Sequence, residues 1–147
     1  MTELDARAEA FRQATSAIRG QAAALSVLER SFRDARVHHA YLFEGPDGVG
    51  KHAVALAFAE ALVRGPDGRK GGRDITRRIA QGMHPDVVAP EADLKTGALS
   101  VDAIREIVRS AAYLPHEGAA RVVILSDAEL LLPETLPAGP NALLKTL

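Results

Sequence analysis

The stretch AYLFEGPDGVGKHAVALAFAEALVR, residues 40–64, decides the fold of this chain. It reads as a short apolar run over residues 40–43, a glycine-rich loop over residues 45–51 and an alanine-rich apolar run that ends before Gly65. This order predicts a strand, a loop and a helix. Because the helix over residues 51–64 is apolar on almost all sides, we expect it to be buried against a parallel sheet.

The loop has the spacing G-x-x-x-x-G-K, which is typical of phosphate binding. Gly45, Gly48 and Gly50 allow successive backbone N–H groups to turn toward phosphate oxygens, and Lys51 adds a positive charge. The positive end of the helix that follows points at the same place. A glycine turn without a ligand is the simpler alternative, but the strand before the loop and the helix after it favour a nucleotide-binding loop.

Two positions that hold magnesium in an active nucleotide hydrolase carry other residues in this chain. The residue after the lysine is normally Ser or Thr, whose hydroxyl binds the ion, and here it is His52, a poor ligand for magnesium. An acid at the end of a neighbouring strand normally holds the same ion, and a second acid orients the attacking water. Here Ser126 and Asp127 follow the apolar run over residues 122–125.

We do not expect Asp127 to replace the missing magnesium-binding acid. Successive side chains of a strand point to opposite faces, so a shift by one residue directs the carboxylate the wrong way. We therefore predict that any ATP or ADP binds weakly, nearly independently of magnesium and more tightly at acid pH, and that the chain does not hydrolyse it.

The rest of the chain adds helices and strands around this centre. Helices are expected over residues 4–18, over residues 21–33 with Leu25, Leu28 and Phe32 on one face, and over residues 101–112 behind a Ser100 cap. The expected buried stripe of the last helix is Val101, Ile104, Val108 and Ala111. Short strands are expected within residues 85–90 and over residues 122–125, and this alternation of strands and helices predicts an α/β domain.

Residues 65–82 are rich in Gly, Pro and Asp and carry several basic side chains. A phosphate-contacting patch is one interpretation of this composition. We favour the other, a mobile and solvated surface loop, because segments of this kind seldom order themselves.

The composition is that of one globular domain. The chain has 147 residues and a net charge of −1, which gives no general attraction to nucleic acid or membranes. It has no Cys, no N-terminal secretory signal and no apolar run long enough to span a membrane, so we expect a cytoplasmic location.

Several strings resemble the clamp-loader subunits of bacterial DNA polymerase III, and among these the delta prime subunits. The strings are IRGQ (18–21), HAYLFEGP (39–46), GVGK (48–51), HPD (84–86), IRE (104–106), DAE (127–129) and NALLKTL (141–147). The resemblance implies an AAA+ (P-loop NTPase) domain over residues 1–147, a parallel sheet flanked by helices that is incomplete at its C-terminus. On this resemblance, we expect residues 1–147 to lack the helical lid and collar domains of the family.

The resemblance also implies a role and partners. Such a subunit works in the ring that loads the sliding clamp on primed DNA, beside the gamma/tau and delta subunits, as a stator that does not hydrolyse ATP. It meets the clamp and the DNA through the complex. An active ATPase of the gamma/tau type is the main alternative, and His52 and Ser126 argue against it. A phosphate-loop kinase unrelated to replication is a third, for which no substrate-binding residues are visible.

We predict that the purified chain contains no zinc. Many members of the family hold a structural zinc with four Cys between the phosphate-loop helix and the HPD string, and this chain has no Cys there or elsewhere. His38, His39, His84 and His116 do not replace them, because lone histidines are usually structural. Metal analysis after dialysis against a weak chelator checks this prediction, and one equivalent of retained zinc would contradict it.

Overall fold

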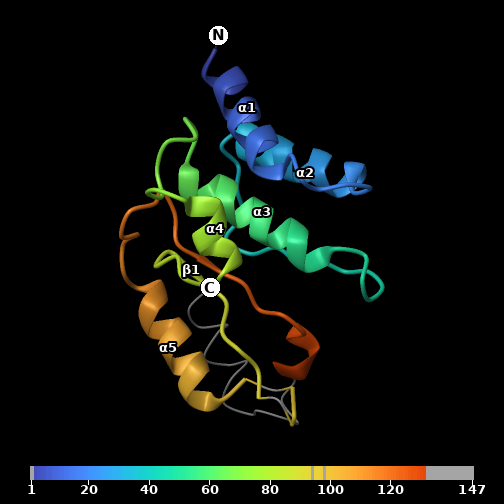
Figure 1. Ribbon diagram of the computed structural model, residues 1–147, viewed down its shortest axis with the longest axis vertical. Helices are drawn as coiled ribbons and strands as arrows, with labels where there is room; N and C mark the ends of the chain where they lie inside the picture. Colours follow the sequence, from blue (N-terminus) through green and yellow to red (C-terminus); the bar gives the residue numbers. More distant parts are fainter. Residues whose placement is uncertain (1, 94, 98, 132–147) are drawn as a thin grey trace.

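The computed structural model describes residues 2–93, 95–97 and 99–131, and it shows a small parallel sheet flanked by helices (Figure 1). The elements are α1 (Glu3–Thr15), α2 (Ala22–Arg33), α3 (Lys51–Arg64), α4 (Ile75–Ala80), β1 (Val87–Val88), α5 (Val101–Ala111), β2 (Val122–Val123) and the 3-10 helix η1 (Ala128–Leu131). The two strands run parallel, with Val87 opposite Val122 and Val88 opposite Val123. Helix α5 supplies the crossover that a parallel pair requires.

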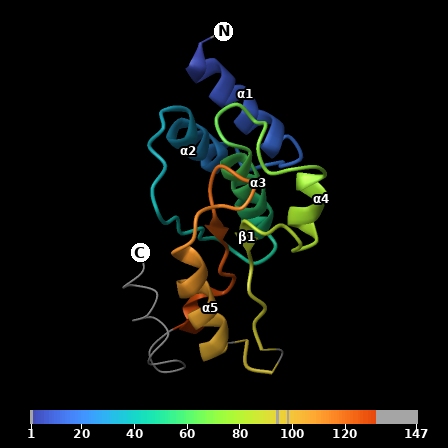
Figure 2. The ribbon, with the colours of Figure 1, turned by 90° about the vertical axis from the view of Figure 1, so that its left-hand side faces the viewer.

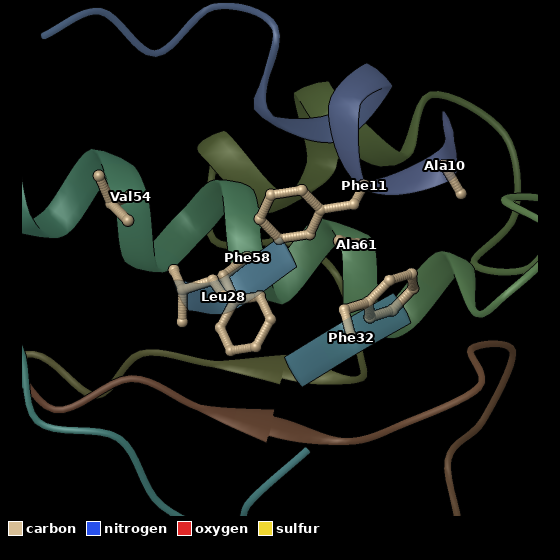
Figure 3. Close-up of a cluster of buried hydrophobic side chains, with 7 residues drawn as sticks. All are labelled: Ala10, Phe11, Leu28, Phe32, Val54, Phe58 and Ala61. Carbon is tan, nitrogen blue, oxygen red and sulfur yellow. The ribbon is translucent and has the colours of Figure 1, made fainter. Parts of the chain in front are cut away.

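Helix α3 lies at the centre of the described chain. One of its faces packs against α1 and α2 in a cluster of buried apolar side chains, formed by Ala10, Phe11, Leu28, Phe32, Val54, Phe58 and Ala61 (Figure 3). The rings of Phe11 and Phe58 meet edge to face, with centroids 6.2 Å apart. The predicted burial of this helix is therefore confirmed, although much of its cover comes from α1 and α2.

The opposite face of α3 packs toward α4 and the sheet. Ala59 and Val63 share a second buried cluster with Ile124, which follows β2. Val123 and Leu125 instead pack against the cluster of α5. Successive side chains of an extended segment point to opposite sides. Residues 122–125 therefore pack against α3 on one side and against α5 on the other. Figure 2 shows the layers in order, from α1 and α2 through α3 to the sheet and α5.

Local signals set the ends of the helices. At the start of α1, the Thr2 hydroxyl accepts a hydrogen bond from the Asp5 N–H at 3.2 Å and the Asp5 carboxylate accepts one from the Thr2 N–H at 3.0 Å. The Ser100 hydroxyl accepts from the Ala103 N–H at 3.1 Å and caps α5, as predicted. Helix α3 ends at Gly65, whose φ of 76° favours glycine.

The predicted strand over residues 40–43 is wrong within the described chain. Tyr41 and Phe43 do pack against the first cluster while Leu42 is 74% exposed, so the alternation of a strand is present. However, β2 pairs with β1, and among the described residues no neighbouring strand forms a hydrogen-bonded ladder with this segment. An apolar pattern places side chains, but a strand also needs a partner for its backbone.

Two further expectations require correction. Residues 65–82 are not wholly loop, because α4 forms there and buries Ile75 and Ile79. The buried residues of α5 are Ile104 and Ile107, whereas Val101 and Ala111 are exposed and Val108 is half-buried. Val123 and Leu125 pack against the side of the helix that carries the two isoleucines. Residues 132–147, which include the NALLKTL string, lie outside the described residues.

The buried carboxylate of Asp86 joins β1 to the segment that leads into β2. Its oxygens accept hydrogen bonds from three successive backbone N–H groups, at 2.6 Å from His116, 2.9 Å from Glu117 and 2.8 Å from Gly118. The Arg121 guanidinium lies 3.6 Å from the same carboxylate. Burial would raise the pKa of Asp86, but these N–H groups outweigh it and hold the pKa below its ordinary value.

His84 completes this junction. Its Nδ1 accepts from the Asp86 N–H at 3.1 Å, so the other ring nitrogen, Nε2, carries the hydrogen that is donated to the Gly71 carbonyl at 2.8 Å. The HPD string therefore ties β1 to both the loop after α3 and the loop before β2. The prediction that this lone histidine is structural agrees with its burial.

We expect Asp86→Ala to lower the free energy of unfolding by about 3–5 kcal/mol at pH 7, because it leaves three N–H groups and Arg121 without their acceptor. The folded-state pKa of Asp86 is depressed, so its contribution is present above the unfolded value of about 4 and is lost as the pH falls through the folded value. The difference between variant and wild type should thus be constant from pH 7 to pH 5 and shrink below about pH 4.

Urea unfolding at several pH values measures this difference. Glu91→Gln is the matched control, since Glu91 is an exposed carboxylate with no ion pair among the described residues. A difference that does not depend on pH, or an equal effect of the control, would contradict the role given to Asp86.

Candidate functional site

The glycine-rich loop adopts a backbone that requires its glycines. Gly48 and Gly50 have φ values of 76° and 103°, in the region that residues with a side chain rarely adopt. Gly45 has a φ of 153°, and a Cβ there would lie 3.2 Å from the Val49 side chain. Helix α3 begins directly after the loop, and Gly50 provides no side chain to cap its first N–H groups. These N–H groups remain suitable for an anion.

Lys51 is held inside its own loop. Its Nζ donates a hydrogen bond to the Gly45 carbonyl at 2.5 Å and lies 3.4 Å from the Pro46 carbonyl and 3.9 Å from the Asp47 carboxylate. The ammonium thus closes the loop on itself. A phosphate group that entered the loop would take the place of these carbonyls as the partner of Lys51.

The segment before α2 also contacts the loop. Gln21, the last residue of the IRGQ string, donates from its side-chain Nε2 to the Val49 carbonyl at 2.7 Å. This bond joins residues that are 28 positions apart in sequence, and it explains why two of the resemblance strings belong to one site.

His52 and Ser126, the two residues that depart from the magnesium-binding pattern, lie beside each other in the structure. The His52 Nδ1 on α3 lies 3.5 Å from the Ser126 Oγ, beyond the end of β2, and both side chains are exposed. An imidazole and a hydroxyl therefore face each other beside the loop. Neither is the carboxylate that divalent cations prefer, so the pair gives little support to a magnesium ion.

Asp127 lies beyond the end of β2, so the alternation that predicted the wrong direction for its carboxylate does not apply to it. Strand β2 ends at Val123, and Asp127 has a φ of 50°. Its exposed carboxylate follows Ser126 in a bend. Within the part of the chain that the structure describes, no group of three His, Cys, Asp or Glu side chains could hold a metal ion.

Sequence reasoning missed the residues that position this site. Asp86 and His84 were noted as part of a string, but nothing in the string showed that they fix the start of β2, whose continuation carries Ser126. Their signal was a charged residue next to an apolar run, flanked by prolines.

Among the described residues, no helix is long and apolar enough to cross a membrane.

Comparisons with known proteins place the chain among DNA polymerase III subunits. Residues 20–147 match the family described as DNA polymerase III, delta subunit. The chain is 37% identical over 125 residues to DNA polymerase III subunit delta' of Escherichia coli, which covers 82% of this chain and 36% of that relative. It is 33% identical over 112 residues to subunit delta' of Pseudomonas aeruginosa, covering 74% and 33%.

A relative named tau/gamma matches comparably well. The chain is 34% identical over 131 residues to DNA polymerase III subunit tau/gamma of Haemophilus influenzae, covering 87% of this chain and 18% of that relative. It therefore spans about a third of the delta' relatives and less than a fifth of the tau/gamma relative. No solved structure matches the chain.

Proposed function

Because this chain belongs to the family described as DNA polymerase III, delta subunit, we propose that it is a clamp-loader subunit of the bacterial polymerase III holoenzyme, of the delta prime type, which does not hydrolyse ATP. In this role it acts in the cytoplasm as a rigid part of the ring that loads the sliding clamp on primed DNA. Its direct partners are the gamma/tau and delta subunits, and it meets the clamp and the DNA through the complex. Residues 1–147 form its AAA+ domain.

The observation that carries the delta prime assignment is the pair His52 and Ser126. Phosphoryl transfer depends on an ion that neutralises the developing charge on the phosphates. A hydroxyl from the phosphate loop and a carboxylate from the neighbouring strand would hold that ion. Here an imidazole and a hydroxyl, 3.5 Å apart, stand at those positions. Lys51 and the loop N–H groups remain, which supports weak binding of ATP or ADP without turnover.

A gamma/tau-like motor is the second candidate. The tau/gamma relative matches over a larger share of this chain than the delta' relatives do, at an identity that lies between theirs. Overall similarity therefore favours neither type, and the chemistry of the loop is what separates them.

Reconstitution tests the clamp-loader assignment. We expect the protein, mixed with gamma/tau and delta subunits from the same source, to join one complex on gel filtration and to support clamp loading. Replacing the gamma/tau subunits with variants that lack the loop lysine should abolish loading, whereas Lys51→Ala in this chain should leave it within about twofold. Failure to join the complex would overturn the assignment.

Nucleotide assays test the degenerate site. We expect ATP affinity to change less than about threefold when magnesium is removed, with no hydrolysis above background, because both magnesium ligands are missing. Lys51→Ala should abolish the residual binding, since it removes the charge of the loop.

The double variant His52→Thr, Ser126→Asp restores both missing ligands and should acquire magnesium-dependent affinity. Magnesium-dependent hydrolysis by the wild-type protein would contradict the stator assignment and favour the motor. The single variants are the matched controls, because each restores only one ligand.

A further inference from the structure

The loop after α3 presents a group of cations that have no acidic partner. We call the exposed side chains of Arg69, Lys70 and Arg73 the basic loop. Within residues 2–93, 95–97 and 99–131, none of these three side chains forms an ion pair or a side-chain hydrogen bond. Positive charge left exposed and unpaired in a chain of net charge −1 requires an explanation.

The other cations of the segment are already engaged. Arg64 pairs with Glu60 on α3 at 2.7 Å, and Arg78 pairs with Glu117 at 2.5 Å. Arg77 pairs with Asp74, but this pair is exposed and therefore weak. Of the acids in the loop itself, Asp67 accepts only the Arg69 backbone N–H. The basic loop is thus the part of the segment whose charge is not neutralised.

The backbone beneath these cations is hydrogen-bonded to neighbouring parts of the domain. The Lys70 N–H donates to the Arg64 carbonyl at 3.0 Å, and the Gly71 N–H donates to the Glu117 carbonyl at 3.1 Å. The Gly71 carbonyl accepts from His84 at 2.8 Å. Gly71 is packed so closely that a Cβ there would lie 2.3 Å from Ile75 Cδ1. The cations therefore project from a fixed turn, which lowers the entropy cost of binding.

This surface is separate from the phosphate loop. The glycine-rich loop precedes the first residue of α3 and the basic loop follows its last, and α3 has 14 residues. At about 1.5 Å per residue, the two sites are about 20 Å apart. Figure 1 shows the two loops at opposite ends of that helix.

The chemistry of the surface favours phosphates over a protein. A protein interface normally has an apolar core, but the large exposed apolar side chains of the described chain all lie outside residues 64–78. A nucleic-acid backbone is bound by charge alone, through Lys and Arg on an accessible turn. Because contacts to phosphates carry no sequence information, such binding does not read sequence.

We propose that Arg69, Lys70 and Arg73 form a direct, sequence-independent contact for the phosphate backbone of nucleic acid. This contact goes beyond the proposed function, in which the chain meets DNA only through its complex, and it does not depend on the phosphate loop.

Fluorescence anisotropy with the intact protein and a labelled 40-base-pair duplex of random sequence tests the contact. Three phosphate contacts predict that log K falls with log salt with a slope of about −2.7, between 25 and 200 mM salt. The triple variant Arg69→Ala, Lys70→Ala, Arg73→Ala should bind at least about tenfold more weakly at 25 mM salt and lose most of that slope. A duplex of permuted sequence should bind equally well.

The control is Arg30→Ala, Arg36→Ala, Arg105→Ala, which removes the same charge from exposed cations elsewhere in the chain and should change affinity less than about twofold. Arg105 pairs with Asp102 at 3.5 Å, but this pair is exposed and therefore weak. Arg69→Lys, Arg73→Lys keeps the charge and should bind like the wild type. Urea midpoints equal to the wild-type value establish that the variants fold.

Three outcomes would overturn the proposal. They are no measurable binding by the wild type at 25 mM salt, equal losses in the two alanine triples, and competition by polyglutamate as effective as that by unlabelled duplex. The last outcome would assign the surface to an acidic protein.

Discussion

The Asp86 carboxylate is the constraint on which the rest of this structure depends. A charge without solvent access is tolerated only if several donors surround it, and here three consecutive backbone N–H groups and Arg121 do so. Those donors belong to the segment immediately before β2. Their attachment to Asp86 therefore brings β2 beside β1, with Val122 opposite Val87. The same network orients His84, which holds the loop after α3.

Helix α3 lies between two layers of the structure and connects the glycine-rich loop to the basic loop. It is covered on one face by α1 and α2 and on the other by α4 and the sheet, and its exposed residues, His52 and Ala53, lie at its N-terminal end. That end follows the glycine-rich loop, and the buried C-terminal end leads to the basic loop. The helix therefore separates the two loops by its own length.

The glycine-rich loop has a backbone whose shape does not depend on ion ligands. Its glycines adopt the φ values that such a turn needs, and the lysine lies within it. Beside the loop, His52 faces Ser126. The backbone geometry follows from glycine positions and a helix start, whereas ion binding would require oxygen ligands from distant segments. The first property can therefore be present without the second.

Elements with local causes could be predicted from the amino-acid pattern. Helix α3 has the predicted bounds because glycines flank an unbroken apolar run, and α5 begins where Ser100 caps it. Only the tertiary structure decided that residues 40–43 lack a ladder, that Ile107 rather than Val101 is buried, and that α4 forms among glycines and arginines. It also decided that Asp86 joins the strands. The physical reason is that caps and turns act within a few residues, whereas ladders, buried charges and the choice of a buried face require partners far away in the sequence.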